Sequence, residues 1–173
     1  TIGMSSGAWR YLRMKQVDRA AAFTLLPPVL AGVVAGLFLF VRLPREWLRL
    51  LVGLVVGAIA LFQLYRASRH IFGSEPVADL GELRRHRLTA LLSGTFSACT
   101  GTGVAEMNQP LIEMRGRLAT KRANATAIFL EAMADWLITV VNLSLGNLRL
   151  DVLVFSASGV LIGAQIGALL SPY

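Results

Sequence analysis

LTALLSGTFSACTGTGVAEMNQPLIE, residues 88–113, is the stretch that decides how this 173-residue chain folds. Its first 18 residues carry no charge, which is close to the length that a helix needs to cross a bilayer. Gly101 and Gly103 then interrupt the helical pattern, and Pro110 restricts how the second half can start or bend. The stretch therefore predicts a broken membrane helix. A plain helix that ends near Thr100, followed by a polar loop, is the alternative.

Composition places the whole chain in a membrane. Hydrophobic residues make up 55% of the sequence and charged residues only 16%, which is too apolar for an ordinary soluble domain. Two uncharged runs are long enough to span a bilayer, and two further apolar segments also read as spans: residues 20–41, 152–173, 50–65 and 124–145. The sequence predicts an all-α, multi-pass bundle of membrane helices.

The net charge of +7 does not indicate nucleic acid as a partner. Basic residues are confined to short segments between the apolar spans, which is the distribution of membrane-flanking charge. If residues 88–113 cross the membrane completely, the basic residues divide ten against seven between the two sides. If this segment enters and leaves on one side, they divide thirteen against four, and the positive-inside rule favours that re-entrant arrangement.

A glycine match between the two halves predicts that the chain contains parts of two related repeats. A shift of 131 residues places Gly32 on Gly163 and Gly36 on Gly167. We expect the rear of a first membrane repeat, a basic cytoplasmic linker and the front of a second repeat, at residues 1–66, 67–87 and 88–173. On this view the chain is a piece of a longer protein that has further sequence at both ends. The Gly32–Gly36 spacing itself predicts close packing of two helices.

Polar groups follow the helix break at a depth where they are costly: Glu106, Asn108 and Gln109. Interrupted helices in membrane transporters place half-helix ends beside a midplane site. The start of such a half-helix offers free N–H groups and a positive partial charge, which suits an anion. The break is therefore the candidate binding site.

The following span carries a second unusual set of side chains, all on one helical stripe: Asn124, Glu131, Asp135 and Asn142. Two carboxylates one turn apart inside a span should not both be ionised in a medium of low dielectric constant. Intramembrane acids mark proton or ion pathways by default. The alternative is that they reach an interface or pair with Arg115, Arg122 or another helix.

Other chemistry has little support. The lone cysteine, Cys99, reads as a small packing residue in an apolar helix. Gly101-x-Gly103 lacks the third glycine and the strand of a dinucleotide site, and the sequence contains no catalytic triad and no metal-spaced His or Cys cluster. We expect no enzyme activity, no cofactor and no metal.

Gly101-Thr-Gly-Val-Ala-Glu-Met-Asn-Gln-Pro110, followed by Ala125-Thr126 and Gly163-x-x-x-Gly167, resembles the TauE/SafE-type sulfite exporter family. Members of that family have two four-span repeats, each opening with a Gly-rich break, a proline and an Ala-Thr-Ser element. This chain departs from the pattern at Val104 and Ala105, where many members continue the glycine run, and at Ala127, which replaces the serine.

The resemblance implies a multi-pass permease of the plasma (inner) membrane that moves sulfite, a sulfonate or a related small organic anion, coupled to protons. It implies the lipid bilayer, the anion and protons as partners and allows a homo-oligomer. The implied substrate-binding residues are Gly101, Thr102, Gly103, Asn108, Gln109, Pro110, Asn124 and Thr126. The implied proton-coupling residues are Glu106, Glu131 and Asp135. A structural or assembly subunit, whose acids pair permanently with arginines, is the alternative to transport, and a membrane enzyme ranks third.

Overall fold

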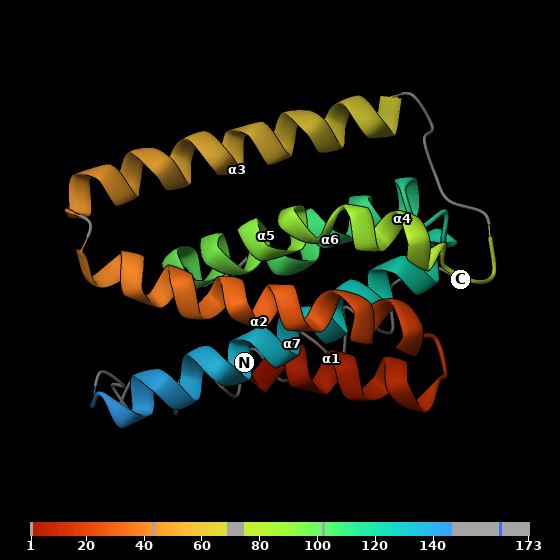
Figure 1. Ribbon diagram of the computed structural model, residues 1–173, viewed down its shortest axis with the longest axis horizontal. Helices are drawn as coiled ribbons and strands as arrows, with labels where there is room; N and C mark the ends of the chain where they lie inside the picture. The colour runs from red at the N-terminus through yellow and green to blue at the C-terminus, as the bar shows by residue number, and fades with distance from the viewer. Residues whose placement is uncertain (1, 43, 69–74, 102, 147–162, 164–173) are drawn as a thin grey trace.

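The computed structural model describes residues 2–42, 44–68, 75–101, 103–146 and 163 (Figure 1). This part of the chain forms seven helices: α1 (Ile2–Arg13), α2 (Arg19–Arg42), α3 (Arg45–Ser68), α4 (Leu80–Arg85), α5 (Arg87–Thr100), α6 (Val104–Met114) and α7 (Thr120–Ser144). Among the described residues, the sole β-type pairing is an isolated bridge between Glu75 and Leu118. The all-α prediction is confirmed.

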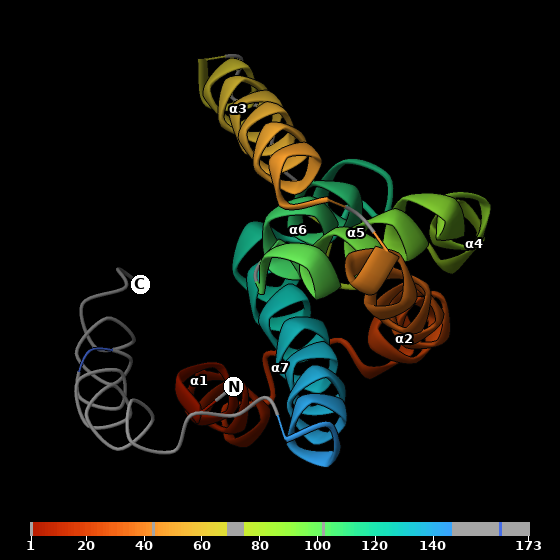
Figure 2. The same cartoon turned by 90° about the vertical axis from the view of Figure 1, so that its left-hand side faces the viewer.

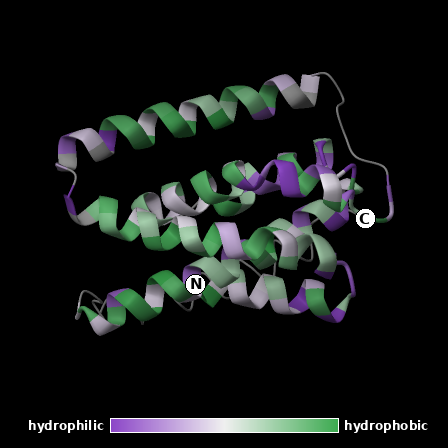
Figure 3. Ribbon diagram, viewed as in Figure 1, coloured by the Kyte–Doolittle hydropathy of each residue, from purple (hydrophilic) through white to green (hydrophobic). Residues whose placement is uncertain are grey.

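Two of these helices are long and apolar enough to cross a membrane. Their apolar stretches are Arg19–Phe40 in α2 and Thr120–Ser144 in α7, and α3 contains the shorter apolar stretch Arg49–Tyr65. Figure 3 shows apolar residues along most of the length of these helices. These helices correspond to the spans expected at residues 20–41, 50–65 and 124–145. The span expected at residues 152–173, which is the end of the expected second repeat, lies outside the described residues except for Gly163.

Glycine brings the backbones of α2 and α5 into direct contact. A Cβ atom on Gly32 would lie 1.9 Å from the carbonyl oxygen of Leu91, and one on Gly94 would lie 2.1 Å from that of Val29. Gly36 continues the contact one turn later, where a Cβ would lie 2.4 Å from the carbonyl oxygen of Thr95. The prediction that Gly32 and Gly36 serve close helix packing is confirmed.

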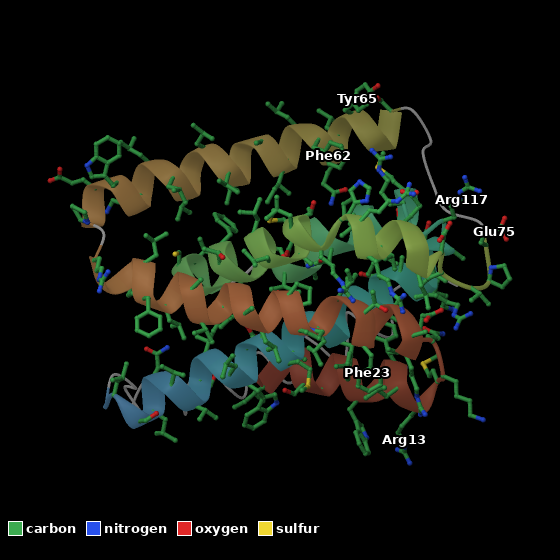
Figure 4. All side chains as sticks on the ribbon, in the orientation of Figure 1. Arg13, Phe23, Phe62, Tyr65, Glu75 and Arg117 are labelled. Carbon is green, nitrogen blue, oxygen red and sulfur yellow. The ribbon has the colours of Figure 1, made fainter. Side chains whose placement is uncertain are left out.

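The helices α5 and α6 form a hairpin whose two ends lie together. The backbone N–H of Asp79, just before α4, donates to the carbonyl oxygen of Gly116, just after α6, at 2.9 Å. The N–H of Glu75 likewise donates to the carbonyl oxygen of Arg117 at 2.8 Å, and these two residues lie beside each other in Figure 4. The chain therefore enters the bundle along α5, turns at the glycines and returns along α6. This geometry is that of the re-entrant arrangement.

The linker expected over residues 67–87 contains a helix, α4. The side chain of Asp79 begins it by accepting hydrogen bonds from the N–H groups of Gly81 and Glu82. Leu83 of α4 is fully buried. The linker is therefore partly structured and helps to fix the start of α5.

Helix α3 stands apart from the other helices (Figure 2). Its large apolar side chains are exposed, with Leu54 at 74% and Trp47 at 66%. Nothing lies within 4 Å of a Cβ built on Gly53 or Gly57. The glycine pair of α3 therefore makes no close contact with another described part of the chain, in contrast to the pair of α2.

The hairpin predicts which residues face the same side of the membrane. Single cysteines at Arg84 and Arg117, introduced into a Cys99→Ala background, should react with a membrane-impermeant thiol reagent from the same side. A cysteine at Glu46, at the opposite end of α2 and α3, should react from the other side. Labelling of residues 84 and 117 from opposite sides would show a complete crossing and exclude the hairpin in the membrane.

The contact between α2 and α5 predicts a contrast between two glycine substitutions. Gly32→Ala forces a methyl group into a backbone carbonyl and should lower the free energy of unfolding by about 1–3 kcal/mol. Gly53→Ala, in open space on α3, should change it little or raise it by up to about 1 kcal/mol. Unfolding of the purified protein in mixed detergent micelles measures both. Equal effects of the two changes would contradict this packing.

Candidate functional site

The candidate site is the break between α5 and α6. Gly101 ends α5 with a φ of 81°, and its N–H donates to the carbonyl oxygen of Ser97 at 2.7 Å. Gly103 begins α6 with a φ of 112°. Both values lie in a region that residues with a side chain rarely adopt, so glycine makes the interruption possible. Thr102, expected to bind substrate, lies outside the described residues.

The two glycines of the break differ in their surroundings. A Cβ on Gly103 would lie 2.8 Å from Cδ1 of Phe96, whereas nothing lies within 4 Å of one built on Gly101. The Phe96 ring therefore packs against Gly103 at the start of α6 and covers one side of the backbone there. Gly103 is needed for both its backbone conformation and its lack of a side chain.

The start of α6 is held by a carboxylate from another helix. No side chain of α6 or of its N-cap residue caps this end. Instead, the side chain of Glu131, on α7, accepts hydrogen bonds from the backbone N–H groups of Gly103 and Ala105. A carboxylate at this position satisfies donors that a helix start leaves free and interacts favourably with the helix dipole. Glu131 is 1% exposed, and its Oε2 atom has no hydrogen-bond partner.

Two further carboxylates surround Glu131. Glu106, in the first turn of α6, and Asp135, one turn further along α7, both lie close enough to repel its negative charge. The structure thus brings together all three of the residues expected to couple to protons. Asn142, the last residue of the stripe, donates instead to the carbonyl oxygen of Ile138 at 2.9 Å, within its own helix.

A row of small polar side chains joins α5 to α6. Asn108, fully buried, donates through Nδ2 to Oγ of Ser93 at 2.7 Å and to the carbonyl oxygen of Val104 at 2.8 Å. Ser97, one turn beyond Ser93, is also fully buried, and its hydroxyl has no hydrogen-bond partner. Sequence reasoning did not identify either serine. Their four-residue spacing on an apolar helix was the available signal.

The remaining expected substrate residues use their polar groups elsewhere or have none in the side chain. Nε2 of Gln109 donates to Oε1 of Glu113 at 3.0 Å, and Pro110 lies buried inside α6 and not at its start. Asn124 lies in the first turns of α7, a partly buried residue.

Thr126 serves the junction between α1 and α2. Its hydroxyl accepts from the N–H of Asp18 at 3.0 Å and donates to the carbonyl oxygen of Arg122 at 2.7 Å. The Nη2 atom of Arg122 in turn lies 3.7 Å from Oδ2 of Asp18. Arg122, one of the arginines considered as a permanent partner for the α7 acids, therefore pairs with a different carboxylate.

Comparison with known families places the chain clearly. The family model described as Sulfite exporter TauE/SafE matches residues 1–173, the whole sequence. The resemblance inferred from the Gly101–Pro110 segment is confirmed. No curated protein and no solved structure matches the chain.

The glycines of the break predict unequal effects of substitution. Gly103→Leu should abolish anion flux while leaving membrane insertion intact, because the side chain collides with Phe96 and displaces the start of α6. Gly101→Ala, with a similar backbone penalty of about 1–2 kcal/mol but open space around it, should lower flux less. Flux into proteoliposomes and the inserted fraction, measured on the same preparation, test this. Normal flux in Gly103→Leu would exclude the break as the site.

Proposed function

The chain belongs to the Sulfite exporter TauE/SafE family, whose members are membrane transporters, and on this basis we propose that it is a proton-coupled permease for a small anion. The substrate class that we propose is sulfite, a sulfonate or a related small organic anion. The site is the break between α5 and α6, and the protein acts as a multi-pass protein of the plasma (inner) membrane.

The observation that carries the proposal is the set of N–H donors at the start of α6. This end has no cap of its own and is held by a carboxylate, which is itself an anionic group with oxygen acceptors. Backbone N–H groups and the helix dipole suit the oxygens of a sulfite or sulfonate group in the same way. The hydroxyl of Ser97, buried and without a partner, adds a further donor on α5.

The residues proposed to bind the anion differ in how directly they contribute. The N–H groups of the break supply the main contacts, and Asn108 fixes α6 against α5 through Ser93. Gln109, Asn124 and Thr126 support the proposal less, because the polar groups of Gln109 and Thr126 already have partners within the fold.

The charge distribution supports an orientation. Among the described Lys and Arg residues, three flank the turn between α2 and α3: Arg42, Arg45 and Arg49. The others lie at the opposite end, where α1, α3 and α6 end and α2, α5 and α7 begin (Figure 1). The positive-inside rule assigns the latter end, with the 67–87 linker, to the cytoplasm. In this orientation the start of α5 and the end of α6 both lie on the cytoplasmic side.

Anion flux into vesicles tests the proposal. The full-length protein in proteoliposomes should take up sulfite or a small sulfonate in preference to a carboxylate of similar size, and an imposed proton gradient should drive accumulation. Empty liposomes and the Gly103→Leu protein are the controls. No uptake of any of these anions, with or without a gradient, would contradict a permease function.

A further inference from the structure

The start of α6 is already occupied by a negatively charged group of the protein itself. Glu131 reaches across from α7 and accepts hydrogen bonds from the N–H groups of Gly103 and Ala105. An external anion that used these donors would therefore have to displace this carboxylate. The geometry makes Glu131 and the substrate competitors for one site.

Glu131 is held less firmly than a permanent cap would be. Its side chain is 99% buried, yet Oε2 finds no hydrogen-bond donor. A buried carboxylate oxygen without a donor is destabilising, because the group has lost its water and gained nothing in exchange. The N–H groups thus bind this carboxylate without satisfying it completely.

The charged groups around Glu131 also favour its release. Glu106 on α6 and Asp135 on α7 are the charged side chains that act on it, and both repel a negative charge. The other described elements packed against α7 are α1, α2 and α5, whose basic residues lie at their ends: Arg10, Arg13, Arg19, Arg42 and Arg87.

We propose that Glu131 and the transported anion alternate on the N–H groups of Gly103 and Ala105, and that a proton on Glu131 makes the exchange possible. This inference rests on the proposed function. A proton adds to the Glu131 carboxylate, the neutral carboxyl group leaves the two donors, and an oxygen of the anion takes its place. When the anion leaves, the carboxyl group loses its proton and binds the donors again.

Charge conservation explains why the exchange couples the two species. The start of α6 carries a positive partial charge that favours one nearby negative charge. A second negative charge in the same place would be repelled, especially beside Glu106 and Asp135. An anion therefore enters with a proton, and the charge next to the helix start stays the same before and after binding.

The test is Glu131→Gln, studied with a small sulfonate whose charge is constant on either side of neutral pH. Any pH dependence of binding then belongs to the protein. Wild-type protein in nanodiscs should bind the labelled sulfonate at least tenfold more tightly at the acidic pH than at the basic pH. Glu131→Gln should bind it with an affinity that is the same at both pH values. It should also exchange sulfonate across liposomes at equal pH but fail to accumulate it in a proton gradient.

A second buried acid provides the matched control. Glu113, on the same helix as the binding donors but near its other end, is also 1% exposed and accepts from Gln109. Glu113→Gln makes the same chemical change and should retain the pH dependence of the wild type. Its thermal stability, compared with that of Glu131→Gln, shows whether either change merely unfolds the protein.

The outcomes separate this inference from the proposed function. Binding and flux by the wild type that show no pH dependence, or a Glu131→Gln protein that keeps the wild-type pH dependence, would overturn the exchange and leave the permease intact. Absence of sulfonate and sulfite flux in the wild type would overturn the permease. If Glu131→Gln is too unstable to assay, Glu131→Asp offers a shorter carboxylate, for which pH-dependent binding should remain but with weaker competition at basic pH.

Discussion

Backbone N–H groups that lie at membrane depth must be bonded, and this requirement governs the centre of the molecule. A helix interrupted by glycines exposes the donors of its second half where no water is at hand. In this chain the donors at Gly103 and Ala105 are bonded by Glu131 of α7. The hairpin and the following span are therefore held together by a polar contact in addition to apolar packing. Without this contact the N–H groups of Gly103 and Ala105 would lack an acceptor, at a cost in stability.

Much of the fold follows from local sequence. The interruption at Gly101 and Gly103 could be predicted, because glycine adopts the left-handed backbone that ends a helix more readily than other residues do. Both glycines have a positive φ in the structure. The close contact at Gly32 and Gly36 could also be predicted, since their four-residue spacing presents two gaps on one helix face. The re-entrant arrangement of α5 and α6 was favoured by the distribution of the basic residues, because the positive-inside rule indicates on which side of the membrane each connecting segment lies.

The site was only partly predictable. The sequence pattern identified a helix start that suits anions and, separately, a set of acids at Glu106, Glu131 and Asp135. That one of these acids bonds to that helix start depends on how α7 packs against α6, which no local spacing encodes. Thr126 shows a second limit of local sequence: its place in a family-like Ala-Thr pair predicts a contact with substrate, but no local spacing predicts the hydrogen bond that its hydroxyl accepts from Asp18. Its partner lies 108 residues away in the chain.

The contact between α2 and α5 has a consequence for motion. The carbonyl oxygen of Leu91 occupies the space where Gly32 lacks a side chain, and the carbonyl oxygen of Val29 does the same at Gly94. Each helix therefore has a backbone group that fits into a gap on the other helix. A slide by one residue rise, about 1.5 Å, would drive a neighbouring side chain into a carbonyl oxygen. We therefore expect α2 and α5 to behave as one rigid unit. If the proposed transport exposes the break to each side of the membrane in turn, we expect α2 and α5 to move together, with the motion at a boundary of this pair such as the one facing α3, which stands apart in Figure 2.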